Sequence, residues 1–99
     1  MEEKQIQIVH NPDKKRFETV IDGKFSKLDY LQDGKNLVIT HVGVHPDLRG
    51  GGLAGQIVQA GLEYARENSF RVIPMCSYAA AYIRKHPEYV ELTKQKTNE

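Results

Sequence analysis

His41, Cys76, Tyr78 and Tyr82 are the residues of this sequence best suited to moving a proton or an acyl group. Histidine exchanges protons near neutral pH, so His41 is a candidate general base. The alternative for His41 is a histidine that packs and forms hydrogen bonds at a sheet edge. Cys76 precedes a predicted helix whose amino terminus would stabilise a thiolate. It is a candidate nucleophile or a residue lining a reaction channel, and the alternative is a small buried apolar side chain.

Tyr78 and Tyr82 are one helical turn apart, so we expect them to project from the same face of that helix. A tyrosine hydroxyl in this position can protonate a leaving group. Two tyrosines on a small helix also pack well in a core, and the sequence leaves both interpretations open.

A glycine-rich segment lies between His41 and these later candidates. Gly50, Gly51, Gly52 and Gly55 follow Arg49 where a predicted strand turns into a predicted helix. One glycine is enough for a tight connection. Three in a row leave a backbone whose N–H groups can approach a ligand at the positive end of a helix. The pattern favours a bound phosphate or pyrophosphate over a purely structural turn.

Two common phosphate loops do not fit this segment. Gln56 and Ile57 replace the lysine and hydroxyl residue that end a nucleoside triphosphate loop. Gly50, Gly52 and Gly55 match the dinucleotide spacing G-x-G-x-x-G, but that motif follows the first strand of its fold and needs an acid about 20 positions later. Here an antiparallel meander precedes the glycines and no such acid ends the next strand, so the match is fortuitous.

Hydrophobic periodicity predicts the elements that position these residues. Apolar side chains alternate in steps of two through residues 6–8, 17–21 and 28–30, and a more continuous run at 36–44 is typical of a central strand. Asp-Gly pairs and other turn sequences join these segments by short connections, which indicates an antiparallel meander.

Two helices and a fifth strand complete the expected fold. Residues 52–68 carry apolar side chains at helical spacing, and residues 70–75 form a short buried strand parallel to the fourth. A second helix begins near Ser77, its predicted N-cap, and ends before Pro87. We therefore expect an α+β fold with a mixed, mainly antiparallel sheet of about five strands and two helices, in the order β-β-β-β-α-β-α.

Length and composition indicate one small domain, 1–99, with an ordered core at about 4–92 and a flexible tail at 93–99. Fourteen basic and thirteen acidic residues give a net charge of +1, so no global field attracts nucleic acid or an anionic membrane. The lone Cys76 suits a reducing cytoplasm, no thiol spacing indicates a metal, and no segment has the roughly 18 apolar residues of a membrane span. We expect a soluble, unprocessed cytoplasmic protein that is a monomer or a weak homodimer.

The segment VHPDLRGGGLAG, Val44 to Gly55, resembles the acetyl-coenzyme A signature of the GCN5-related N-acetyltransferase family, Arg/Gln-x-x-Gly-x-Gly/Ala after a strand ending in Val-x-Pro. Arg49, Gly52 and Ala54 occupy the signature positions. The sequences PMCSY and RKHPEY resemble a carboxy-terminal pattern of the small, single-domain branch of the family. The resemblance covers residues 36–90 and implies a truncated domain with little sequence left to build an acceptor pocket.

The resemblance implies an N-acetyltransferase that moves an acetyl group from acetyl-coenzyme A to a primary amine of a small molecule or protein. In that family the loop amides bind the pyrophosphate, and the preceding strand separates from the next to admit the pantetheine arm. The coenzyme A-binding residues implied or expected here are Val42, Gly43, Val44, Arg49, Gly50, Gly51, Gly52, Leu53, Ala54, Gly55 and Cys76. His41 would be the base and Tyr78 or Tyr82 the acid for the leaving thiolate. The alternative function is a non-catalytic coenzyme A or acyl-coenzyme A binding module.

Overall fold

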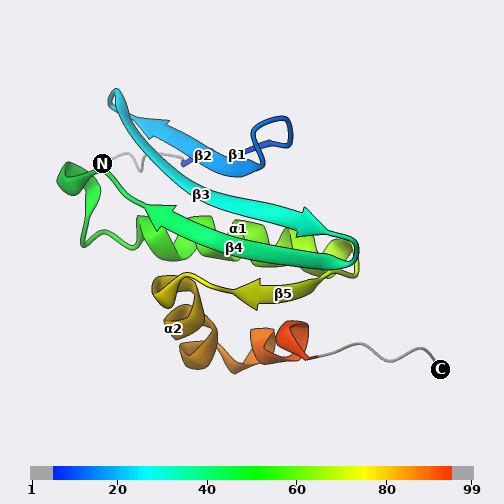
Figure 1. The fold of residues 1–99 in the computed structure, drawn as a ribbon. Helices are drawn as coiled ribbons and strands as arrows, with labels where there is room; N and C mark the ends of the chain where they lie inside the picture. The colour runs from blue at the N-terminus through cyan, green and yellow to red at the C-terminus, as the bar shows by residue number, and fades with distance from the viewer. Residues whose placement is uncertain (1–5, 95–99) are drawn as a thin grey trace.

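The computed structural model describes residues 6–94, which form a single five-stranded sheet with its helices (Figure 1). The elements in chain order are β1 Val9–Asn11, β2 Arg16–Ile21, β3 Lys24–Asp33, β4 Asn36–Gly43, the 3₁₀ helix η1 Pro46–Leu48, α1 Leu53–Glu67, β5 Arg71–Pro74, α2 Ser77–Lys85 and the 3₁₀ helix η2 Pro87–Thr93. The strands lie in the order β1-β2-β3-β4-β5, with antiparallel pairs up to β4 and a parallel β4–β5 pair. The expected mixed α+β fold with two α-helices is confirmed.

The sheet buries one face against α1, which crosses behind it in Figure 1. Alternate side chains of β2 and β3 point towards this helix, as the two-residue period predicts. The helix contributes one apolar stripe: Leu53, Ile57, Val58, Gly61, Leu62 and Ala65. A Cβ atom on Gly61 would lie only 3.4 Å from Cδ1 of Leu28, so the glycine lets the helix approach the sheet closely.

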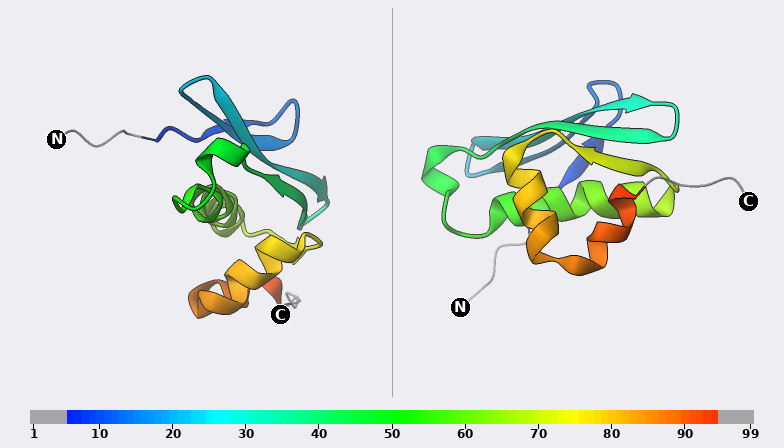
Figure 2. Two further views of the ribbon diagram at one scale, coloured as in Figure 1. Left: turned by 90° about the vertical axis from the view of Figure 1, so that its left-hand side faces the viewer. Right: turned by 60° about the horizontal axis from the view of Figure 1, so that its bottom comes forward.

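Both views of Figure 2 show the helices on one side of the sheet and beyond β5, so no helix of the described chain covers the opposite face. We call this opposite face the open face. It carries exposed apolar side chains, such as Val20 and Leu31, and a polar network around Asp29 in its middle. The open face is therefore available to a ligand or substrate along β3 and β4.

The first strand and the cap of the second helix differ from the prediction. The first strand is Val9–Asn11, and Ile6 and Ile8 pack against the core before it begins. The N-cap of α2 is Cys76 rather than Ser77, which is the first helical residue, and no side chain caps the helix.

After Pro87 the chain continues as η2, which was not predicted. The helix η2 buries Tyr89 and Leu92 and includes Thr93, so the chain is helical up to a residue predicted to belong to the tail. The rest of that predicted tail beyond Lys94, and residues 4 and 5 of the predicted core, lie outside the described residues. Between Ile6 and Lys94, no helix is long and apolar enough to cross a membrane.

Candidate active site

The sheet divides at Ile39, in the middle of β4. The pairing of β4 with β5 covers only Asn36 to Ile39, whereas the pairing with β3 continues to Gly43. The backbone N–H groups of Met75 and Cys76 both donate to the carbonyl oxygen of Ile39, at 3.0 and 3.1 Å, where the chain leaves the sheet. Beyond this point the edge of β4 that faces β5 has no strand partner within the described chain.

A β-bulge at the same level changes which way the β4 side chains point. Asp29 of β3 is in register with His41, and the next residue, Tyr30, is in register with Ile39, so Thr40 is an additional residue in β4. The Thr40 hydroxyl donates to the Asp29 carbonyl at 3.2 Å. Because a bulge shifts the two-residue alternation by one position, Val42 packs against the core while His41 is exposed.

A pocket of about 560 Å³ lies along this part of β4 and extends to the start of α1. Its lining residues come from β3, β4, the following loop and both α-helices: Phe25, Lys27, His41, Val42, Gly43, Val44, His45, Arg49, Ala54 and Tyr78. Many of the residues predicted from sequence are therefore brought together around one pocket. The other predicted site residues are not among its lining residues: Gly50, Gly51, Gly52, Leu53, Gly55, Cys76 and Tyr82.

The loop after β4 presents a bare backbone at the amino terminus of α1. Gly50 and Gly52 have φ angles of +89° and +83°, and a Cβ atom at either residue would meet nothing within 4 Å. Gly52 is the N-cap of α1 and supplies no side-chain cap, and the first turn contains no acidic residue.

The first N–H group to bond back into the helix belongs to Gln56, which donates to the Gly52 carbonyl at 3.2 Å. Among the hydrogen bonds of residues 6–94, none is donated by the backbone amides from Gly50 to Gly55. Free amides at the positive end of a 15-residue helix suit a phosphate. The residues present therefore fit the diphosphate of coenzyme A.

The short helix η1 fixes the approach to this loop. The His45 N–H donates to the Ser26 hydroxyl at 3.0 Å, and His45 Nδ1 accepts from the Asp47 N–H at 3.1 Å. His45 is half-buried and lines the pocket. Arg49 is exposed, and its Nε donates to the Val44 carbonyl at 3.3 Å, which holds the guanidinium beside the mouth of the loop.

Gly55 has a different environment from the other loop glycines because it packs against α2. A Cβ atom on Gly55 would lie 3.2 Å from Cε2 of Tyr82 and 3.7 Å from the Tyr78 hydroxyl. The Tyr82 ring also stacks on His86, with 3.9 Å between ring centroids. Burial raises the pKa of the Tyr82 hydroxyl, and Glu88 and Tyr78 add to the effect. Tyr82 therefore stays protonated and packs, whereas Tyr78 reaches the pocket.

Cys76 lies where the divided sheet meets α2. It is half-buried, packs against the hydrophobic core and is the N-cap residue of α2. Its sulfur is near the helix terminus as predicted, but the residue is separate from the pocket lining. Between Ile6 and Lys94, no group of three histidine, cysteine, aspartate or glutamate side chains is arranged to hold a metal ion.

The sequence did not identify Phe25, Lys27 and His45 as site residues. Phe25 and Lys27 point to the open face because they alternate with Ser26 and Leu28, which are buried. The period of two predicts that direction, but their neighbours depend on the register with β4. Lys27 is in register with Gly43, two residues beyond His41, and only the bulge fixes that pairing.

Comparison with known proteins identifies the family and the fold. The family model of the GCN5-related N-acetyltransferases matches residues 16–92, so the chain belongs to this family. The fold is similar to the solution NMR structure of a GCN5-like protein from Staphylococcus aureus, a proposed N-acetyltransferase. The TM-score is 0.72 at 25% sequence identity, over 94% of this chain and 92% of that chain. Family membership implies an acetyltransferase.

Proposed function

We propose that this protein transfers the acetyl group of acetyl-coenzyme A to a primary amine. The observation that carries the proposal is the free backbone from Gly50 to Gly55, which adjoins a pocket along an unpaired stretch of β4. Loop amides and the α1 dipole bind the diphosphate, and Arg49 adds a cation at the same place. The pantetheine arm then runs beside Val42, Gly43 and Val44, where β4 offers backbone hydrogen-bonding groups to its amides.

The chemistry we propose uses His41 and Tyr78. His41 is exposed on the open face and lines the pocket, so it can take a proton from the incoming amine. The amine nitrogen attacks the thioester carbonyl carbon, a C–N bond forms and the C–S bond breaks. The Tyr78 hydroxyl gives a proton to the leaving thiolate, and solvent restores both side chains. The products are an N-acetyl amide and free coenzyme A.

Tyr82 and Cys76 have supporting places in this proposal. Tyr82 holds α2 against Gly55 and so fixes the position of Tyr78 one turn away. Cys76 anchors the start of α2 to Ile39 through its backbone N–H. An acetyl-cysteine intermediate would require the thiol to reach the pocket that Cys76 does not line. Intact-mass measurement after exposure to acetyl-coenzyme A tests this point. We expect no acetyl increment on Cys76; an increment on wild type that disappears in Cys76→Ser would show a covalent intermediate.

Release of free thiol from acetyl-coenzyme A, measured with a panel of amines, tests the proposed function. The panel contains polyamines, aminoglycosides, amino acids and lysine peptides, each with a control lacking protein. We expect acceptor-dependent release, with the acetyl amide identified by mass spectrometry. Binding of coenzyme A by calorimetry without release for any acceptor would contradict turnover and favour a coenzyme A-binding module. Absence of both binding and release would contradict the phosphate site itself.

A further inference from the structure

One wall of the pocket belongs to the open face of the sheet. Phe25 and Lys27 of β3 and His41 and Gly43 of β4 lie on this face, away from α1. Of the residues that line the pocket, Lys27 and Arg49 carry a fixed positive charge, and none is an aspartate or a glutamate. The lining residues themselves therefore offer a cationic ligand no carboxylate partner.

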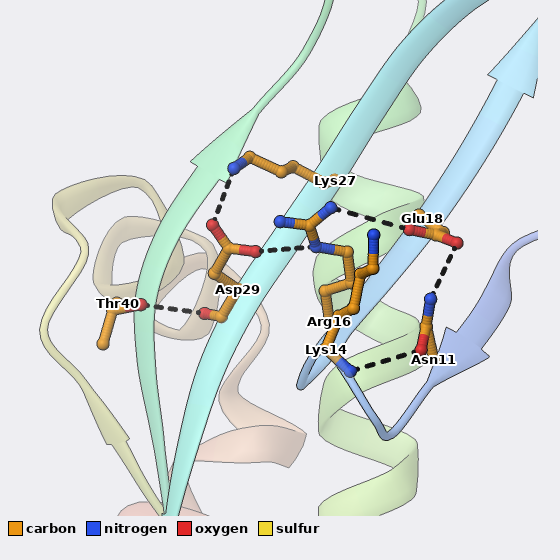
Figure 3. Close-up of polar contacts among 7 residues, drawn as sticks. All are labelled: Asn11, Lys14, Arg16, Glu18, Lys27, Asp29 and Thr40. Atoms are coloured by element: carbon orange, nitrogen blue, oxygen red, sulfur yellow. Dashed lines mark hydrogen bonds and ion pairs between the residues drawn. The ribbon is translucent and has the colours of Figure 1, made fainter.

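The Lys27 ammonium is held by a polar network on the open face (Figure 3). Lys27 Nζ lies 2.8 Å from one carboxylate oxygen of Asp29, and Arg16 Nε donates to the other oxygen at 3.2 Å. Arg16 also lies 3.9 Å from Glu18, which accepts from Asn11 Nδ2 at 3.3 Å. Asp29 is thus shared between Lys27 and Arg16, and Glu18 is a second, more distant ion-pair partner of Arg16.

Lys27 keeps hydrogen-bonding capacity for a ligand. An ammonium has three N–H donors, and the ion pair with Asp29 occupies one of them. The side chain is 29% exposed, so the group is fixed in place and still reachable. An anion that approaches it gains a charge-assisted hydrogen bond without ordering a flexible side chain.

The direction of Lys27 distinguishes two sources of such an anion, the cofactor phosphates and the acceptor. Lys27 is in register with Gly43, but its ammonium extends along β3 to Asp29, which is in register with His41. The proposed phosphate site begins at Gly50, beyond the end of β4 and beyond η1. The ammonium therefore lies at the level of the proposed base rather than at that of the loop.

We propose that the acceptor is a primary amine that also carries a carboxylate, and that Lys27 binds this carboxylate beside His41. The inference rests on the proposed acetyl transfer. A fixed ammonium near the reacting nitrogen also disfavours the protonated amine, which keeps the nucleophile neutral. Acceptors with several positive charges and no carboxylate are poor substrates for the same reason.

Pairs of acceptors that differ by one carboxylate test this proposal. Lysine is compared with cadaverine, and 4-aminobutyrate with butylamine, at saturating acetyl-coenzyme A. We expect kcat/KM to favour the carboxylate member of each pair by about tenfold or more, which is the effect of one net ion pair. Lys27→Gln should remove the preference by raising KM for the carboxylate acceptors relative to the plain amines. Lys27→Arg should keep it.

The matched control is Lys24→Gln. Lys24 lies on the same strand, its ammonium is 3.9 Å from the exposed Asp47, and it does not line the pocket. This variant should keep the wild-type preference. Calorimetry with coenzyme A should give the same affinity for Lys27→Gln and wild type; weaker binding with an unchanged acceptor preference would assign Lys27 to a cofactor phosphate and overturn the inference. Equal rates within each pair would overturn the inference about the carboxylate but leave the proposed acetyl transfer in place. If none of the acceptors is acetylated, the proposed function is overturned as well.

Discussion

A Cβ atom on Gly55 would lie 3.2 Å from Cε2 of Tyr82, so the first turn of α1 and the middle of α2 are as close as a glycine allows. The sequence pattern places Gly55 in the predicted phosphate loop with Gly50 and Gly52. The structure separates it from them, because both of those residues have positive φ angles and open space above Cα. We infer that Gly55 is required for packing two helices, and that the other two glycines shape the loop.

Gly55→Ala should therefore show energetic coupling to Tyr82. Alanine gains up to about 1 kcal/mol over glycine inside a helix, whereas a methyl group forced against a packed ring costs about 1–3 kcal/mol. We expect Gly55→Ala to be less favourable by about 1 kcal/mol or more in the wild-type background than in Tyr82→Ala. Urea unfolding of the four proteins of this double-mutant cycle measures the coupling. Additive effects would show that the ring moves aside freely.

His41→Gln tests the proposed base. General base catalysis contributes typically 10²–10⁴-fold, so we expect kcat to fall by about 10²-fold while the affinity for coenzyme A stays at the wild-type value. His86→Gln is the matched control, because this histidine ends α2 and does not line the pocket. A wild-type kcat in His41→Gln would transfer the role of base to solvent.

His10 should make stability depend on pH. Its ring stacks on Phe17 at 4.3 Å between centroids, and its Nε2 lies 2.5 Å from the Tyr30 hydroxyl. Burial lowers the pKa of His10 below the usual value near 6.5. At pH values between the pKa of His10 in the folded protein and its pKa in the unfolded chain, the unfolded chain binds more protons than the folded protein. His10 therefore contributes to a loss of stability as pH falls below about 6.5.

Urea unfolding at about pH 7.5 and about pH 5 measures this contribution. The free energy of unfolding should fall more between the two pH values in wild type than in His10→Phe, which cannot titrate. An equal fall in both proteins would show that protonation of His10 is not linked to folding.

Tyr89 should stabilise the unpredicted helix η2. Its ring is 3% exposed, and its hydroxyl donates to Glu63 of α1 at 2.7 Å. The pKa of this hydroxyl is raised by burial first and by the hydrogen bond to Glu63 second. Tyr89→Phe keeps the ring and removes the bond, so we expect a loss of about 1 kcal/mol in urea unfolding. Glu63→Gln in the Tyr89→Phe background should add little; a full additional loss would mean that the two residues act independently.

The strands and helices were predictable because their signals are local. Alternation through Phe17, Thr19 and Leu28 and the helical stripe from Leu53 to Ala65 depend only on which side chains face the core. The glycine loop was predictable for a similar reason. Its composition is unusual at short range, and glycine permits the positive φ found at Gly50 and Gly52.

The features that could not be predicted depend on contacts between residues far apart in the sequence. The bulge at Thr40 decides that His41 faces the open side and brings Lys27 to the pocket, and it follows from the register of β3 with β4. The packing role of Gly55 depends on α2, which lies 22 residues later in the chain at Ser77. The N-cap at Cys76 depends on two hydrogen bonds to Ile39, which are also long-range.

Coenzyme A affinity of Gly52→Val, compared with Gly34→Val, tests the phosphate loop most directly. Both glycines have positive φ, +83° and +60°, and neither has an atom within 4 Å of a built Cβ, so both changes impose similar backbone strain. Gly34 lies in the turn between β3 and β4, outside the pocket lining.

We expect isothermal titration calorimetry to give at least about 100-fold weaker coenzyme A binding for Gly52→Val, or about 2.7 kcal/mol, and wild-type affinity for Gly34→Val. Far-ultraviolet circular dichroism should stay native for both. Equal affinities for wild type and a folded Gly52→Val would contradict the account.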